Sequence, residues 1–335
     1  MALTRVAACH VSPHFLSARK TVDKATSFVQ TAAKNSANLI VLPETYISAF
    51  PIWSALRPPT ENHDLFRRMV QQSIYADGKE VQALRDIACD TNSVISIGIS
   101  EKANSNHACL YNLNLIIGHT GEILVHHRKL MPTFFEKLIW SPGDGYGLRV
   151  ADTPYGRIDG LICGENTNPL ARFSLIAQRE EKIIFLLGRL SGLHVFHRHL
   201  MMMEMQQRLR RSMIMFLRIV SVRQHTVSKQ SSSTPDVIRN ALLTSSKGVS
   251  MFLDSSGAPS PSFRIDEEIG EQRPTEFLQN EEGIIYADLE LSRCIEGKQY
   301  HDVVGEYQRL DVFELKVNRS RKNHVNFTES RDVEE

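Results

Sequence analysis

The sequence lacks a long apolar run, an excess of charge of either sign and a dense set of cysteines. No apolar run approaches the roughly 20 residues that a membrane-spanning helix needs. The first 15 residues do not have the basic and then apolar order of a secretory signal. The 39 Lys and Arg residues nearly balance the 38 Asp and Glu residues, so the net charge is +1. We therefore expect a cytoplasmic protein that has neither nucleic acid nor a membrane as a partner.

The cysteines are few, odd in number and widely spaced: Cys9, Cys89, Cys109, Cys163 and Cys294. This spacing fits neither a disulfide framework nor a zinc site, and it indicates reduced thiols in an intracellular compartment. The composition, with 42% hydrophobic and 23% charged residues, is that of an ordinary globular protein. A length of 335 residues allows one large domain or two small ones.

The hydrophobic pattern alternates between the period of a strand and that of a helix. We expect strands at residues 6–11, 39–42, 94–99, 249–253 and 284–289, helices at 22–33 and 81–88, and hairpins at 110–117/123–127 and 148–151/158–162. Turn signals separate the two arms of each hairpin, His119-Thr120-Gly121 in the first and Pro154-Tyr155-Gly156 in the second. The pattern predicts an α/β sandwich.

Three reactive residue types follow predicted strands, where open α/β sheets usually place reacting groups. Glu44 follows residues 39–42, Lys129 follows 123–128 and Cys163 follows 158–162. A cation beside a cysteine favours the thiolate, and a carboxylate within reach can take the thiol proton, so together they would form an activated nucleophile. Taken singly, Cys163 fits a packing residue, Glu44 a turn cap and Lys129 a solvated basic run. Spacing by itself leaves both interpretations open.

Three sequence blocks carry a family resemblance. They are Leu-Pro-Glu-Thr at residues 42–45, His-Arg-Lys-Leu-Met-Pro-Thr at 127–133 and Cys-Gly-Glu-Asn-Thr-Asn-Pro-Leu-Ala at 163–171. In this order they resemble the nitrilase branch of the carbon–nitrogen hydrolase superfamily. The resemblance covers residues 3 to about 182 and resumes from about 246 to 319. It implies a four-layer α-β-β-α sandwich that assembles into dimers or larger spirals.

The resemblance also implies a reaction and its residues. Glu44 would be the general base, Cys163 the nucleophile and Lys129 the group that stabilises the intermediates, together with backbone N–H groups near Gly164. Glu136 would support Lys129 as a second acid or base. The reaction would turn a nitrile and water into a carboxylic acid and ammonia through a thioimidate and a thioester on the cysteine. It needs no metal and no organic cofactor.

The string that begins at Cys163 resembles fungal-type arylacetonitrilases, whereas many family members have Trp directly after the nucleophile. Gly164 in that place either leaves room for an aryl or arylalkyl nitrile or permits backbone strain near the oxyanion site. Two further alternatives remain: an amidase of the same superfamily, and a catalytically inactive scaffold.

Residues 184–229 do not resemble the sequences of this family. If its codons are read one nucleotide earlier, the segment can encode nitrilase-like sequences at three places, with tryptophans where Gly188 and Gly192 now stand. We hypothesise an out-of-frame stretch, and we expect it to break the register of a central strand. Outside that stretch we expect a single domain over residues 1–317 and a polar, frayed tail at 318–335.

Overall fold

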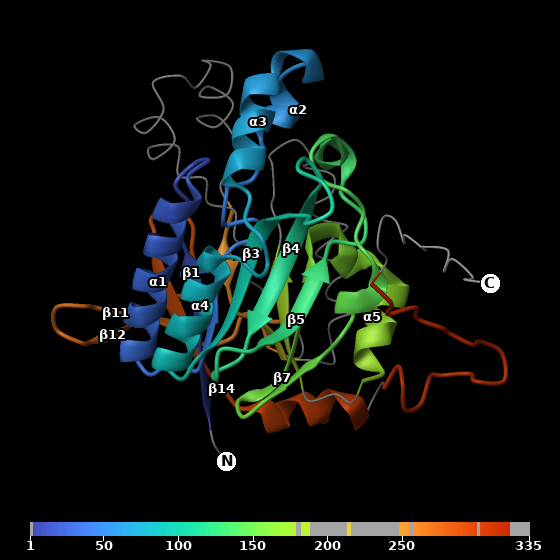
Figure 1. Ribbon diagram of the computed structural model, residues 1–335. Helices are drawn as coiled ribbons and strands as arrows, with labels where there is room; N and C mark the ends of the chain where they lie inside the picture. Colours follow the sequence, from blue (N-terminus) through green and yellow to red (C-terminus); the bar gives the residue numbers. More distant parts are fainter. Residues whose placement is uncertain are drawn as a thin grey trace, which may run out of the picture.

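Two β-sheets lie face to face in the computed structural model, which describes residues 3–178, 182–187, 213–215, 248–254, 257–299 and 302–321 (Figure 1). The larger sheet has the strand order β12 (Gln272–Pro274), β11 (Phe263–Ile265), β14 (Gly283–Leu289), β1 (Thr4–His10), β2 (Leu39–Val41), β3 (Val94–Lys102), β4 (Leu110–Ile117), β5 (Ile123–Arg128). Strands β1, β2 and β3 run parallel, and the others pair antiparallel.

The second sheet has the order β6 (Ala151–Thr153), β7 (Gly156–Ile162), β8 (Lys182–Leu187), β9 (Met213–Met215). Strand β7 pairs antiparallel with β6 and parallel with β8. A short separate ladder joins β10 (Ser250–Met251) to β13 (Phe277–Leu278).

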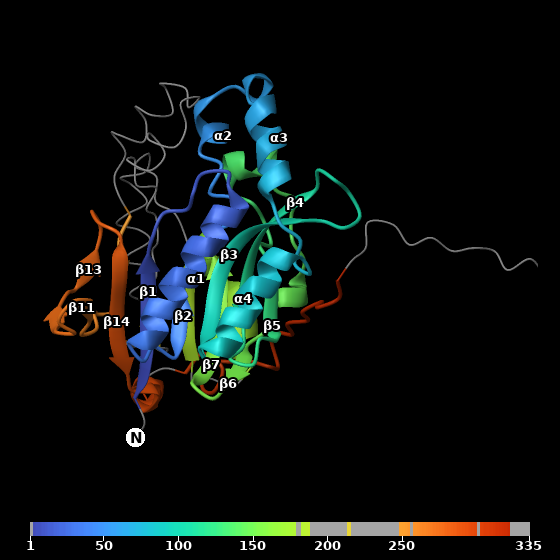
Figure 2. The same cartoon turned by 60° about the vertical axis from the view of Figure 1, so that its left-hand side comes forward.

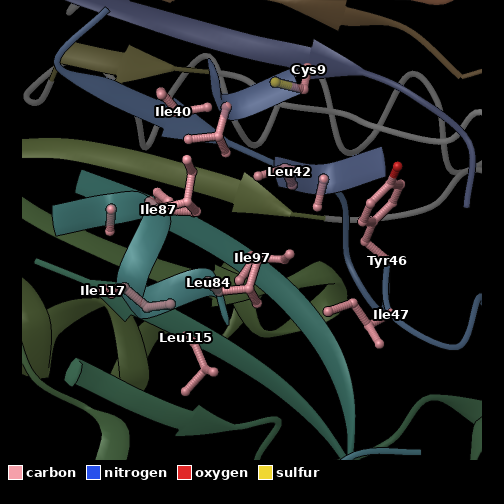
Figure 3. Close-up of a cluster of buried hydrophobic side chains, with 14 of the residues drawn as sticks. Cys9, Ile40, Leu42, Tyr46, Ile47, Leu84, Ile87, Ile97, Leu115 and Ile117 are labelled. Carbon is pink, nitrogen blue, oxygen red and sulfur yellow. The ribbon is translucent and has the colours of Figure 1, made fainter. Parts of the chain in front are cut away.

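The alternation of side chains along the strands separates two apolar layers. Ile40 and Leu42 belong to the layer under helices α1 (Ala18–Lys34) and α4 (Lys79–Asp90), part of which Figure 3 shows. Leu39 and Val41 point to the opposite face and pack with Ile158 of the second sheet. Figure 2 shows the two helices side by side over the larger sheet. A strand buried on both faces explains why residues 39–42 are continuously apolar.

A fourth layer covers the outer face of β7. Leu161 of that strand packs with Ala171 and Leu175 of helix α5 (Pro169–Ile176). The helix begins where the Asn168 side chain accepts hydrogen bonds from the backbone N–H groups of residues 170 and 171, which is a favourable N-cap. The layer order is therefore α-β-β-α, as the sequence predicts.

The remaining short helices connect the layers. They are α2 (Trp53–Leu56), α3 (His63–Gln72) and the 3₁₀ turns η1 (Pro59–Glu61), η2 (Phe134–Leu138), η3 (Gly145–Gly147), η4 (Cys163–Thr167) and η5 (Leu291–Gln299). Helices α2 and α3 form a projection beyond one end of the larger sheet (Figure 1). Within the described ranges, no helix combines the length and the apolar character that crossing a bilayer requires.

Most sequence predictions of elements agree with this architecture. Both hairpins are present, and Gly121 has the positive φ of 83° that its turn requires. The first arm of the second hairpin is shifted, because it begins at Ala151 rather than at Leu148. Residues 145–147, just before the expected arm, form a 3₁₀ turn capped by the Asp144 side chain. The strand expected at residues 249–253 is reduced to Ser250–Met251, and helix α3 was not predicted.

The segment 184–229 begins within a strand that keeps its register. Strand β8 continues to Leu187 in parallel pairing with β7, and β9 pairs with β8 in turn. The expected loss of register therefore does not occur up to Leu187, and residues 183–187 form a continuous apolar run in the sequence. Residues 188–212 and 216–229 lie outside the described residues, and the out-of-frame hypothesis stays a prediction.

Arg321, in the C-terminal segment, contacts the end of β5 and the loop before η3. The guanidinium of Arg321 donates to the backbone oxygen of His126 at 3.2 Å, approaches Asp144 at 3.5 Å and lies over the ring of Tyr146. An anchoring cation offsets the cost of ordering residues 318–321. Residues 322–335 lie outside the described residues, and the frayed tail expected at 318–335 stays a prediction. The domain boundary at residue 317 stays a prediction.

Candidate active site

The loops that follow β2, β5 and β7 bring Glu44, Lys129 and Cys163 together between the two sheets. Glu44 comes three residues after the end of β2, and a Cβ at Gly98 would lie only 2.6 Å from its Cα. Glycine at this position is what allows the neighbouring strand to approach the Glu44 backbone. Lys129 directly follows β5, and Cys163 directly follows β7.

Lys129 is buried and bonded to two carboxylates. Its Nζ donates to Glu136 Oε2 at 2.6 Å and to Glu44 Oε1 at 3.3 Å. Asn112 on β4 contacts both Glu44 and Lys129. Its Nδ2 donates to Glu44 Oε1 at 2.8 Å, and its backbone oxygen accepts from Lys129 N at 2.8 Å. A buried ammonium is stable only when it is paired in this way.

Glu136 is held in place from a second direction. Its Oε2 accepts a hydrogen bond from Thr133 N at 3.0 Å, which closes a capping box at the start of η2. Only 4% of the Glu136 surface is exposed, so this residue is not a surface acid. The structure brings Glu136 to the same ammonium as Glu44.

Cys163 has an unusual backbone conformation at the end of its strand. Its φ is 53°, in the left-handed region that non-glycine residues rarely adopt. The Cys163 Sγ and carboxylate oxygens of Glu44 and Glu136 all lie within 4.8 Å of one another, and Cys163 is half-buried. Strain of this kind is typical of functional turns, because it points a side chain out of the strand into a site.

The charges determine what these groups can do. Burial by itself lowers the pKa of Lys129, but the charges of Glu44, Cys163 and Glu136 outweigh it and raise that pKa above its ordinary value. Burial raises the pKa of Glu136, and Lys129 offsets this shift only in part. The site therefore holds a permanent cation, and Glu136 takes a proton more readily than an exposed glutamate.

The free oxygen of Glu44 is positioned for proton transfer. Oε1 carries the bonds from Asn112 and Lys129, whereas Oε2 is buried and has no hydrogen-bond partner among the described residues. A carboxylate with one oxygen anchored and the other free is suited to take a proton from a thiol or a water. Glu44, Glu136 and Cys163 have the atoms of a metal site, but Lys129 already bonds to both carboxylates and would repel a divalent cation there.

The space around Gly164 separates the two interpretations of this residue. Gly164 does not adopt a positive φ, and the strained residue is Cys163 instead. A Cβ added at Gly164 would meet Thr133 Oγ1 at 3.6 Å, an ordinary contact distance. Backbone strain therefore does not require glycine at this position, and the geometry favours the interpretation that glycine leaves room beside the nucleophile.

Sequence reasoning missed Asn112, His127 and Glu165. Glu165 Oε2 accepts from His127 Nε2 at 2.9 Å and from Ile162 N at 2.8 Å, and its Oε1 accepts from Leu130 N. His127 and Glu165 lie inside the quoted sequence blocks, which was an available signal for both. Asn112 gave none beyond being a polar residue in an apolar strand.

Comparisons with known proteins agree with this architecture. The family model described as carbon-nitrogen hydrolase matches residues 5–299. An aliphatic nitrilase of Rhodococcus rhodochrous is 28% identical over 329 residues, which cover 96% of this chain and 84% of the relative. An arylacetonitrilase of Aspergillus kawachii is 31% identical over 324 residues, which cover 96% of this chain and 94% of the relative.

Solved structures show the same fold at lower identity. A Saccharomyces cerevisiae protein of branch 10 of the nitrilase superfamily superposes with a TM-score of 0.62 at 18% identity, covering 92% of this chain and 97% of its own. A CN-hydrolase superfamily protein from Xanthomonas campestris also gives 0.62, at 14% identity, covering 95% of this chain and 100% of its own.

Proposed function

The chain belongs to the carbon–nitrogen hydrolase family, and from this premise we propose that it is a nitrilase acting through Cys163. The observation that carries the proposal is the convergence of one thiol, two carboxylates and one ammonium in a largely buried site. A nitrile carbon is a weak electrophile, so its hydrolysis needs a thiolate and a proton for the nitrogen that becomes negative. The four groups supply both.

The first half of the reaction consumes one water and releases ammonia. Glu44 takes the Cys163 proton, the sulfur–carbon bond forms, and the proton passes to the nitrile nitrogen to give a thioimidate. Glu44 then removes a proton from a water that attacks the same carbon. The tetrahedral intermediate collapses with loss of ammonia, and a thioester remains on Cys163.

The second half releases the acid. A second water, activated by Glu44, attacks the thioester, and the Cys163 sulfur leaves and regains its proton. Lys129 and the backbone N–H groups near Gly164 stabilise the negative charge that develops on the nitrile nitrogen during attack and on the tetrahedral intermediates, an effect worth about 3 to 4 kcal/mol per donor. Glu136 holds Lys129 and supplies or accepts a proton, which its raised pKa favours.

The proposed substrate is an aryl or arylalkyl nitrile. The open space at Gly164 supports this choice, because among the described residues other than its two chain neighbours the nearest atom to a potential Cβ is Thr133 Oγ1 at 3.6 Å. The name of the Aspergillus kawachii relative, an arylacetonitrilase, points to the same class. Partners on this proposal are the nitrile and water.

We also propose a cytoplasmic homo-oligomer, a dimer or a larger spiral. Large apolar side chains that are exposed on the single chain support assembly: Met131, Phe134, Leu138, Leu170, Tyr307, Leu310, Val312 and Phe313. Exposed apolar surface of this extent commonly marks contacts between copies.

Ammonia release from phenylacetonitrile tests the proposal. The unaltered chain is expected to release ammonia, and Cys163→Ala is expected to release none above background. Equal release by the two proteins would disprove a role for the thiol. Faster turnover of phenylacetamide than of phenylacetonitrile would favour the amidase alternative, and no turnover of either would favour the scaffold.

A further inference from the structure

Glu165 is a buried carboxylate that none of the proposed chemical steps uses. It lies two residues after Cys163, in η4, and only 6% of its surface is exposed. Burial raises the pKa of Glu165, but the His127 ring and the backbone N–H groups outweigh it and lower that pKa. An ionised buried carboxylate is costly unless its hydrogen bonds are complete, so its partners show what it does.

Its partners come from both sides of the site. Ile162 N, which donates to Oε2 at 2.8 Å, belongs to the residue before Cys163. Leu130 N, which donates to Oε1, belongs to the residue after Lys129. His127 Nε2 adds a third contact, at 2.9 Å to Oε2. His127 lies near the end of β5, two residues before Lys129. One carboxylate thus joins the backbone beside the nucleophile to the backbone beside the ammonium.

The contacts of Glu165 with Ile162, Leu130 and His127 form a joint between the two sheets. Strand β5 belongs to the larger sheet and β7 to the smaller one, and no ladder hydrogen bond connects them. Apolar packing between the sheets is not directional, so it cannot fix two backbones to a few tenths of an ångström. Charged hydrogen bonds with defined geometry can, and they are about twice as strong as neutral ones.

We propose that Glu165 is a positioning residue that sets the distance and direction between the Cys163 thiol and the Lys129 ammonium by binding the backbone next to each. The inference rests on the proposed function only for its kinetic readout. A misplacement of about 1 Å in such a site costs on the order of 100-fold in rate. Loss of the joint should therefore lower kcat far more than it weakens substrate binding.

Glu165→Gln is the sharpest substitution, because glutamine has the same shape. If its oxygen takes the place of Oε2, its amide nitrogen faces the Leu130 N–H, and two donors meet. If its oxygen takes the place of Oε1, the amide nitrogen faces the Ile162 N–H. In either orientation one side of the joint is lost.

Glu101→Gln is the matched control. Glu101 is also buried and ionised, and it bonds to His126 and Arg128 on the same strand β5. Within the described part of the chain, its carboxylate pairs with these two β5 side chains and not with Cys163 or Lys129. Both substitutions remove one buried charge, so a general loss of stability should affect both proteins alike.

Two readouts separate positioning from folding. The first is kcat and KM for phenylacetonitrile, measured well below the unfolding midpoint of each variant. The second is the rate of Cys163 alkylation by iodoacetamide relative to that of the exposed Cys89 in the same sample, followed by peptide mass spectrometry. The second readout needs no turnover, so it remains informative if the proposed nitrilase activity is absent.

For Glu165→Gln we expect kcat to fall about 100-fold with KM changed less than about 3-fold, and the alkylation ratio to fall about 10-fold, because the thiol no longer faces the ammonium. Glu101→Gln should keep both readouts within about 3-fold of the unaltered chain, as substitutions away from the chemistry usually do. If Glu165→Gln does not fold, Glu165→Asp decides, since it keeps the charge but reaches only one side of the joint. Unchanged kcat and alkylation ratio in the folded variant, or equal losses in the Glu101 control, would overturn the proposal.

Discussion

Replacing Glu136 by Gln separates two roles that the structure allows for this residue. In the first role, Glu136 only holds Lys129, through the 2.6 Å bond from Nζ to Oε2. In the second, it also gives or takes a proton during turnover, which its raised pKa supports. Glutamine keeps the shape and can still accept the bonds from Lys129 and Thr133, but it carries neither the charge nor a transferable proton.

The two roles predict different losses of rate. A hydrogen bond to a charged group contributes about 1.5 to 3 kcal/mol, against about 0.5 to 1.5 kcal/mol for a neutral one. The difference of about 1 to 2 kcal/mol corresponds to roughly a 5- to 30-fold loss in kcat if Glu136 only holds Lys129. Loss of a general acid or base costs about 100-fold or more. We expect the larger loss, because Glu136 lies beside the reacting thiol as well as beside the lysine.

The assay is steady-state ammonia release from phenylacetonitrile, with urea unfolding of the same samples as the control for folding. A fall of 100-fold or more at unchanged unfolding free energy supports proton transfer by Glu136. A loss of roughly 5- to 30-fold restricts Glu136 to holding Lys129. Near-normal turnover would contradict both roles and the importance of the bond to Lys129.

Three further predictions concern other parts of the chain. Gly164→Trp should lower kcat/KM for phenylacetonitrile relative to propionitrile at least about tenfold, as filling a hydrophobic pocket does; an unchanged ratio would contradict the space argument. Burial raises the pKa of Glu101, but His126 and Arg128 outweigh it and lower that pKa from 4.5 to about 2. The ionised Glu101 therefore stabilises the fold fully at a pH above 4.5, and this contribution to the unfolding free energy is lost as the pH falls through about 2. Acid unfolding should therefore show about 3 kcal/mol less pH dependence in Glu101→Gln, whereas identical acid curves would refute the shift. Transcript sequencing should show a one-nucleotide difference or an altered splice near the codons of residues 182–184 and a compensating change near 229–233, and a matching transcript with a soluble, active product would refute the hypothesis.

Local rules were sufficient for much of the fold. The hairpin of β4 and β5 follows from a glycine turn between two apolar runs, and α1 and α4 follow from helical spacing. Helix α3 was missed although Leu65 and Met69 are buried and Phe66 and Val70 pack beside them, a helical spacing that was an available signal. The shift of β6 to residues 151–153 follows from its antiparallel pairing with β7, Ala151 with Ile158 and Thr153 with Gly156, which the apolar pattern does not specify.

The candidate site was predictable only in part. Glu44, Lys129 and Cys163 follow apolar strands, and the structure places all three together as expected. The contact between Asn112 and Glu44 joins residues 68 positions apart, and that between His127 and Glu165 joins residues 38 apart. The first contact depends on the strand order within the larger sheet and the second on how the two sheets are stacked, and periodicity encodes neither. The positive φ of Cys163 is likewise a property of the folded turn.

The most direct test of the account is the identification of the covalent intermediate. Acid quenching during turnover of phenylacetonitrile, followed by peptide mass spectrometry, should find the phenylacetyl group on the peptide that contains Cys163. The half-buried Cys109 and the exposed Cys89 serve as internal controls and should remain unmodified. An acyl group on either control cysteine, or continued turnover by Cys163→Ala, would contradict the assignment of Cys163 as the nucleophile.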